Sequence, residues 1–191
     1  FRDIRESIDE VHRDGTLKDV VRADLGRYLV RDPELGPSLH KLRSAGKRLF
    51  LLTNSQADYT DAVMRHLLDG VLPEYPSWRN YFDVVITAAT KPAFFADAVP
   101  FAELDADGRR LGAEVRAFER ARTYAGGNRG DFERIVGARG DRILYVGDHL
   151  AGDVRVTKSI LRWRTALVLR ELEDELAAAE GNRPLEAELE Q

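Results

Sequence analysis

The sequence predicts an α/β fold built on a doubly wound parallel sheet. Short runs rich in apolar and β-branched residues predict buried strands, at residues 48–55, 82–87, 143–146 and 163–169. Helical patterns separate these runs, and strands that alternate with helices are typical of a parallel sheet with helices on both faces. Small polar or acidic residues follow several of the runs, at the end where ligands sit in open α/β sheets.

Composition narrows the class of protein. The 191 residues are 43% hydrophobic and 32% charged, which allows one good-sized domain with a core. The net charge is −4 without a long block of Lys or Arg, so we expect neither nucleic acid nor an anionic membrane surface as a partner. No apolar run reaches the roughly 20 residues of a membrane span. The absence of cysteine excludes disulfides and thiolate metal sites and fits a reducing cytoplasm.

The first residues predict an amphipathic helix. Its apolar stripe, which can face a core, consists of Ile4, Ile8 and Val11. Arg5, Asp9 and His12 have the same spacing on the neighbouring stripe. Three different polar groups in line could bind a ligand, but Arg5 and Asp9 also form an ordinary i, i+4 surface pair. The spacing alone favours that pair.

Two further helices are predicted before the first strand. Gly15 ends the first helix, and Thr16 is expected to cap a second one over residues 18–28. A third helix is predicted over residues 37–45, with Gly46 as its end.

The strand at residues 48–55 runs into Thr53, Asn54 and Ser55, and a helix pattern follows. Hydroxyls and backbone N–H groups at a strand end and a helix N-terminus can bind a phosphate, helped by the helix dipole. Simple capping of the helix by Asn54 or Ser55 is the alternative, and from this segment alone it is favoured.

Lys91 lies a few residues beyond the strand at residues 82–87 and precedes Pro92. A lysine at this end of a strand could supply a positive charge to a phosphate. The alternative is an exposed lysine whose backbone the proline restricts.

Asp105-Ala-Asp-Gly108 imitates two kinds of functional motif. As a calcium loop it lacks the third acidic position and the closing Glu. As a nucleophile site it lacks a preceding apolar strand, because Glu103 interrupts the run. We assign it to the tip of a hairpin, where Asp-Gly is common.

The strand at residues 143–146 ends at Gly147 and is followed by Asp148 and Asp153. Two carboxylates at a strand end suit a hard cation such as Mg²⁺, which takes a few carboxylate oxygens and leaves other positions to water and phosphate. The alternative is a turn and a helix cap, and the segment alone does not decide between the two.

The remaining elements are assigned from turn and helix signals. Asp131 is expected to cap a helix through Ile135. A helix is predicted over residues 150–159, and the Glu- and Ala-rich tail from Arg170 is expected to be a solvated helix.

Taken together, the strand-end motifs resemble the haloacid dehalogenase superfamily. They are Thr53-Asn-Ser55, Lys91-Pro92 and Gly147-Asp-His-Leu-Ala-Gly-Asp153, in that order. Other segments narrow the resemblance to the cytosolic purine 5′-nucleotidases, over essentially the whole chain. These segments are Arg5 to Lys18, Tyr59-Thr-Asp61, Lys91-Pro-x-Phe-Phe95, Tyr124-x-Gly-Gly127 and Trp163-Arg-Thr165.

The resemblance implies Mg²⁺-dependent hydrolysis of purine nucleoside 5′-monophosphates, inosine and guanosine monophosphate in particular, through an aspartyl-phosphate. It implies that Lys91 and Asp148 are catalytic, Asp148 as a metal ligand with Asp153 in support. Phosphate would be bound by Thr53, Asn54, Ser55 and Lys91. The nucleotide pocket would be lined by Arg5, Asp9, His12 and Lys18.

The resemblance also implies a domain division. Residues 1–33 would be the end of a cap domain, residues 34–170 a catalytic core with the superfamily's doubly wound, Rossmann-like sheet, and residues 171–191 an acidic helical tail. The family's first motif, an apolar strand that ends in Asp-x-Asp-x-Thr and carries the nucleophile, is absent from the sequence. We therefore expect the chain to be part of a longer protein and to be inactive by itself.

Two alternatives to a nucleotidase stay open at this point. One is a related protein that binds nucleotide as a scaffold or regulatory subunit without turnover; the joint presence of Lys91, Asp148 and Asp153 argues against it. The other is a two-component receiver-like domain. It is disfavoured because its acidic pair comes first in the chain, whereas here the acidic strand comes late. Whether the protein forms a homo-oligomer also stays open.

Overall fold

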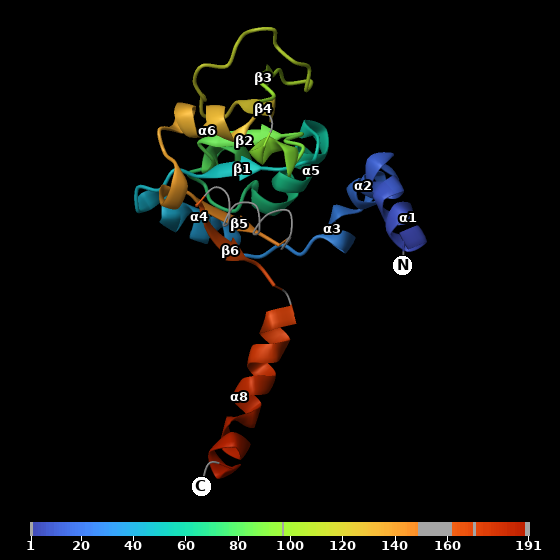
Figure 1. The fold of residues 1–191 in the computed structure, drawn as a ribbon, viewed down its shortest axis with the longest axis vertical. Coiled ribbons are helices and arrows are strands. Elements are labelled where there is room, and N and C mark those ends of the chain that lie inside the picture. The colour runs from blue at the N-terminus through green and yellow to red at the C-terminus, as the bar shows by residue number, and fades with distance from the viewer. Residues whose placement is uncertain (1, 97, 149–161, 170, 190–191) are drawn as a thin grey trace. The chain divides into compact units, whose positions relative to one another are not determined.

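The computed structural model describes residues 2–96, 98–148, 162–169 and 171–189 (Figure 1). The chain divides into two compact units, Phe1–Gly137 and Ala138–Gln191, and each is described by itself. The predicted division at residues 33 and 170 separates a cap, a catalytic core and a tail, not compact units, and it stays a prediction.

The first unit begins with helices α1 (Arg2–Arg13), α2 (Thr16–Ala23), α3 (Leu25–Tyr28) and α4 (Leu35–Ser44). Gly15 separates α1 from α2 with a φ of 88°, as its position predicted. Thr16 is not a cap but the first residue of α2, and its N–H donates to the Asp14 carboxylate at 2.8 Å. The predicted helix over residues 18–28 is two helices, because Asp24 leaves the helical conformation between them.

The central sheet of this unit has four strands in the order β1-β2-β4-β3. Their bounds are β1 (Phe50–Leu52), β2 (Val84–Thr87), β3 (Phe101–Leu104) and β4 (Thr123–Gly126). β1, β2 and β4 are parallel, and β3 pairs antiparallel with β4 at the edge. Helix α5 (Ala57–Leu68) follows β1, α6 (Arg129–Val136) follows β4, and short 3₁₀ helices η1 (Trp78–Tyr81) and η2 (Ala93–Phe95) lie in the loops. The mixed α/β fold with a mostly parallel sheet is thus confirmed.

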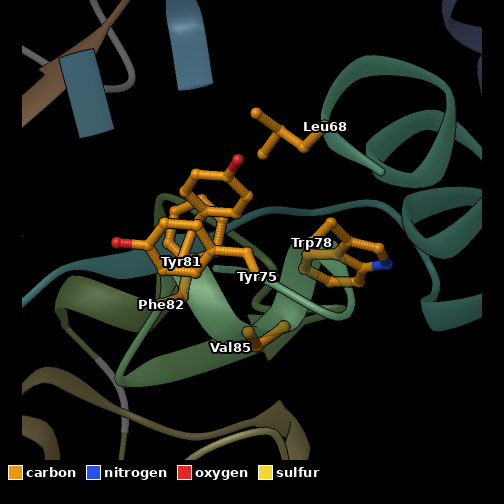
Figure 2. Packing of buried hydrophobic residues seen from close by; sticks show 6 residues of the cluster. All are labelled: Leu68, Tyr75, Trp78, Tyr81, Phe82 and Val85. Carbon is orange, nitrogen blue, oxygen red and sulfur yellow. The ribbon is translucent and has the colours of Figure 1, made fainter. Parts of the chain in front are cut away.

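One face of the sheet packs against α4, α5 and the segment that leads to β2 (Figure 2). The buried cluster on this face consists of Leu68, Tyr75, Trp78, Tyr81, Phe82 and Val85. The rings of Tyr75 and Tyr81 stack with centroids 3.9 Å apart, and Trp78 is only 1% exposed. This face therefore holds a large part of the core and fixes the end of α5.

The opposite face of the sheet carries a group of aromatic rings. Alternate side chains of the same strands point to this face. Phe50 of β1 lies 5.0 Å from Phe132 of α6, measured between ring centroids. Phe118 contacts Tyr124 of β4 at 4.9 Å and Phe101 of β3 at 5.0 Å. Both faces of the sheet are thus covered, as the doubly wound prediction required.

The N-cap of helix α6 lies three residues earlier than predicted. Asn128, not Asp131, is its N-cap, and the Asn128 carboxamide oxygen accepts the Asp131 N–H at 2.9 Å. Asp131 lies in the first helical turn instead. Hydrogen bonds from Arg134 and Asn128 hold the pKa of Asp131 below its usual range.

The second unit contains η3 (Gly140–Arg142), the parallel pair β5 (Leu144–Gly147) and β6 (Arg164–Leu167), and helix α8 (Glu171–Leu189). Tyr145 and Trp163 are buried in this unit, with ring centroids 6.3 Å apart. The side chains of α8 are exposed from Glu171 to Gly181, as expected for a solvated helix. The helix predicted over residues 150–159 lies outside the described residues. Among the residues that are described, no helix combines the length and the apolarity needed to cross a membrane.

Candidate active site

The loops after β1 and β2 meet at one edge of the sheet, because the two strands are parallel neighbours. The Ala89 N–H donates to the Thr53 carbonyl at 3.0 Å, and the Ala88 N–H donates to the Ser55 carbonyl at 2.8 Å. These bonds fasten the loop after β1 to the loop that leads to Lys91. The structure thus brings together two of the predicted motifs, which are far apart in the sequence.

Asn54 and Lys91 make the closest connection between these loops. The Asn54 Nδ2 donates to the Lys91 carbonyl at 2.9 Å, and the Lys91 N–H donates to the Asn54 Oδ1 at 2.6 Å. Both polar atoms of one carboxamide therefore bind both backbone polar groups of one residue. The position of Lys91 is set by the loop after β1 as well as by its own loop.

Helix α5 begins at this edge, directly after Thr53-Asn54-Ser55. Its N-cap residue is Gln56, whose side chain makes no capping hydrogen bond. The alternative that Asn54 or Ser55 caps the helix is wrong, since Asn54 is bonded to Lys91 and the Ser55 N–H donates to the Thr53 hydroxyl at 3.1 Å. Asp58 lies in the first turn of α5 and its carboxylate accepts the Tyr59 N–H, so the N–H groups before Asp58 and the positive end of the helix dipole are what the helix offers to an anion.

The loop before Lys91 has an unfavourable backbone conformation. Ala88 and Thr90 have φ angles of 46° and 56°, in the left-handed region that residues other than glycine rarely adopt. Such conformations persist only where surrounding bonds enforce them, and they cluster at functional sites. The bonds to Thr53, Asn54 and Ser55 supply that enforcement here.

The end of β4 lies at the same edge, since β4 runs parallel to β2. Gly127 follows this strand with a φ of 87°, and a Cβ built on it would lie 1.9 Å from the Phe101 ring. Only glycine fits this position. Asn128 then fixes the next turn, where its Nδ2 donates to the Val99 carbonyl at 2.8 Å.

Asp105 follows β3 at the end of the sheet where β4 begins. β3 is antiparallel, and its last residue, Leu104, pairs with Thr123 at the start of β4. The strand that precedes Asp105 is interrupted by Glu103, as predicted from the sequence, and so is not an apolar strand. The assignment to a hairpin turn is confirmed, because the Asp105 carboxylate accepts the N–H groups of Asp107 at 2.9 Å and Arg109 at 2.8 Å. The Asp105 carboxylate is therefore bonded within its own turn, although this turn approaches the start of α5: a Cβ built on Gly108 would lie 4.0 Å from the Cβ of Ala57.

Helix α2 reaches α5 next to this site. The Lys18 Nζ lies 5.6 Å from the centre of the Tyr59 ring, and Arg22 forms an ion pair with Asp58 at 2.9 Å. Burial raises the pKa of Asp58, but the Tyr59 N–H and the Arg22 charge outweigh it and leave that pKa below its usual range. Lys18 thus lies beside the first turn of α5.

The predicted nucleotide-binding residues lie on successive turns of α1; they are Arg5, Asp9 and His12. The backbone of α1 is described, but these three side chains lie outside the described part of the chain. Ile4 and Ile8 are 66% and 50% exposed, so within the described residues this apolar stripe does not face a core.

Asp148 directly follows β5 in the second unit and is exposed. Its predicted place at the carboxyl end of a parallel strand is confirmed, while Asp153 lies outside the described residues. Where side chains are described, no three His, Asp or Glu residues come together to hold a metal ion. The carboxylate of Asp148 is nevertheless the type of hard oxygen ligand that Mg²⁺ prefers.

Comparisons with known proteins identify the family. The model of the 5′ nucleotidase family matches residues 1–191. The human 5′-nucleotidase domain-containing protein 2 is 37% identical over 177 residues, which is 92% of this chain and 33% of the human protein. The protein of the same name from Rattus norvegicus is also 37% identical over 177 residues, 92% of this chain and 31% of its own length. A 5′-nucleotidase domain-containing protein of Dictyostelium discoideum is 37% identical over 176 residues, 91% of this chain and 30% of its own length.

The chain therefore spans about a third of the length of these relatives. The family match, in contrast, runs through both units and includes the loops described above. The chain belongs to the 5′ nucleotidase family.

Proposed function

We propose that the full-length protein hydrolyses nucleoside 5′-monophosphates, with inosine and guanosine monophosphate preferred, in the cytoplasm. Family membership supports the reaction class. The observation that carries the proposal is the joined pair of loops at the ends of β1 and β2, which places Lys91 beside Asn54 and next to the start of α5.

The phosphate would be bound at this edge. The hydroxyls of Thr53 and Ser55 and the Ala57 N–H at the start of α5 can donate to phosphate oxygens. Lys91 would supply a positive charge, which stabilises the charge on the transferring phosphoryl group. Asn54 belongs to the same set by resemblance, and its structural contact is with Lys91.

Mg²⁺ would be held by the Asp148 carboxylate, with Asp153 in support. Asp148 fits the ion as one ligand, because it is an exposed carboxylate at the end of a strand. When bound, the ion would supply positive charge at this end of β5. The role of Asp148 is to hold the ion at the strand end.

The nucleoside would be bound by the N-terminal helices. Arg5, Asp9 and His12 share one face of α1 and would contact the base or ribose. Lys18 would add a positive charge from α2, close to the start of α5, as its contact with Tyr59 indicates.

The nucleophile would come from the family's Asp-x-Asp-x-Thr motif, which residues 1–191 do not contain. Asp105 does not replace it, because the Asp105 carboxylate accepts the N–H groups of Asp107 and Arg109 and so belongs to its own hairpin turn. We therefore expect residues 1–191 alone to release no phosphate.

The experiment is an assay of phosphate release from inosine 5′-monophosphate by the full-length protein, as wild type, Lys91→Ala and Lys47→Ala. Lys47 is an exposed lysine in the turn after α4 and serves as the matched control. We expect Lys91→Ala to lower kcat/KM by about 100-fold, as for other groups that stabilise a transition-state charge, and Lys47→Ala to change it less than about twofold. Wild-type protein that binds the nucleotide without releasing phosphate would instead support a scaffold or regulatory subunit.

A further inference from the structure

The Asn54 side chain is fully matched to the Lys91 backbone. Its Nδ2 donates to the Lys91 carbonyl at 2.9 Å while its Oδ1 accepts the Lys91 N–H at 2.6 Å. Only a carboxamide offers a donor and an acceptor side by side on a short side chain. Alanine would offer neither group, and aspartate would place a second acceptor against the Lys91 carbonyl.

We call the two hydrogen bonds between the Asn54 side chain and the Lys91 backbone the Asn54–Lys91 tie. The loop that carries Lys91 needs such additional bonds to keep its conformation. Ala88 and Thr90 hold left-handed backbone conformations that are unfavourable for residues with a Cβ. The start of the loop is held by the bonds from Ala88 to Ser55 and from Ala89 to Thr53. The bonds to Asn54 hold the residue that directly follows Thr90, so they fix the loop at the point where the Lys91 side chain leaves it.

Asn54 is exposed and Lys91 is half-buried. The Asn54–Lys91 tie lies at the surface. Water can replace such bonds at little cost to the folded state, whereas the direction of the Lys91 side chain depends on them. Removal of the Asn54 carboxamide should thus affect the geometry of the site more than the stability of the protein.

We infer that Asn54 is a positioning residue, which acts on the reaction by holding the Lys91 backbone so that its ammonium group faces the phosphate. The inference rests on the proposed function and deepens it, because it gives Asn54 an effect that passes through Lys91. A residue that only bound a phosphate oxygen would act independently of Lys91. The two roles therefore predict different results when both residues are changed.

The test is a double-mutant cycle in the full-length protein with Asn54→Ala, Lys91→Ala and the double variant, assayed with inosine 5′-monophosphate. We expect Asn54→Ala to lower kcat/KM by about tenfold in the wild-type background and by less than about twofold in the Lys91→Ala background. Ser55→Ala is the matched control, since a hydroxyl that binds phosphate directly should cost a similar factor in both backgrounds.

A second measurement detects the Asn54–Lys91 hydrogen bonds without an activity assay. Amide hydrogen exchange should become faster at the Lys91 N–H in Asn54→Ala and stay unchanged at the Ala89 N–H, whose partner is the Thr53 carbonyl. Unchanged exchange at Lys91, or equal losses from Asn54→Ala in both backgrounds, would overturn the inference while the proposed function stands. Wild-type protein that releases no phosphate would overturn the proposed function and the inference with it.

Discussion

The indole N–H of Trp78 donates to the Asp61 carboxylate at 2.9 Å, which joins the buried end of η1 to the middle of α5. The same carboxylate accepts Arg65 and Arg79, each at 2.6 Å. Burial raises the pKa of Asp61, but the hydrogen bonds from Trp78 and Arg65 and the charge of Arg79 outweigh it and leave that pKa below its usual range. Asp61 is thus a structural residue that supports the helix at the candidate site.

Asp61→Ala should lower the free energy of unfolding by about 2 kcal/mol, because the Trp78 indole and two guanidinium groups lose a charged partner. Asp58→Ala, three residues earlier in the same helix, removes an exposed ion pair with Arg22 and should cost less than about 1 kcal/mol. Urea denaturation of the full-length variants measures both. Equal costs would contradict the structural role of Asp61.

Acid should remove this contribution. The folded-state pKa of Asp61 is lowered, so its stabilisation is complete above the unfolded-state pKa of about 3.9 and is lost as pH falls through the folded-state value. The difference in unfolding free energy between wild type and Asp61→Ala should be constant near neutral pH and shrink below about pH 4. Denaturation at a series of pH values checks this. A difference that grows on acidification would show the opposite linkage.

Gly127→Ala should destabilise the protein by roughly 2 to 4 kcal/mol, because the new Cβ would overlap the Phe101 ring and Gly127 has a positive φ. Gly137→Ala is the matched control. Gly137 also has a positive φ, of 65°, but nothing lies within 4 Å of the added Cβ, so only the conformational cost of about 1 kcal/mol applies. Thermal denaturation separates the two effects, and equal shifts in Tm would mean that the Phe101 contact is unimportant.

Much of the fold could be predicted because its strands are continuous apolar runs. β1, β2 and β6 lie within predicted runs, and β5 extends one residue beyond its predicted run, to Gly147. β3 was implied only as one arm of a hairpin, since Glu103 interrupts its apolar pattern at a half-buried edge. The cap of α6 was placed at Asp131 instead of Asn128, because both residue types cap helices well and the sequence does not show which N–H groups need a partner.

The site was predictable as a set of strand ends but not as a set of contacts. Thr53 and Lys91 follow neighbouring parallel strands, so the sequence placed them at one edge. The bonds of Asn54 join residues far apart in the chain and depend on the left-handed turns at Ala88 and Thr90, for which neither residue type gives a signal. The Asp61 network was missed for the same reason, since its partners come from separate elements.

Base selectivity tests the proposed role of α1. A 6-oxopurine offers O6 and N7 as adjacent acceptors for a guanidinium and an N1–H for a carboxylate, whereas adenine offers a donor and an acceptor in the reverse places. Mismatched buried groups cost about 1 to 3 kcal/mol each, so inosine and guanosine monophosphate should exceed adenosine monophosphate by at least about tenfold in kcat/KM.

Arg5→Ala in the full-length protein should reduce that ratio by slowing the 6-oxopurine substrates more than adenosine monophosphate. Equal slowing of both substrates would instead support the surface ion pair of Arg5 and Asp9. Steady-state kinetics with the three nucleotides distinguishes the two interpretations.

The most direct test of the whole account is phosphate release from inosine 5′-monophosphate by full-length wild type and Asp148→Asn over a range of Mg²⁺ concentrations. Wild type should turn over the nucleotide in a Mg²⁺-dependent manner. Asp148→Asn should lose most of that activity and need more Mg²⁺, with an unchanged Tm, because Asp148 is exposed at the end of β5. Unchanged kinetics with a lowered Tm would make Asp148 a turn residue, and wild type without phosphate release would contradict the proposed reaction.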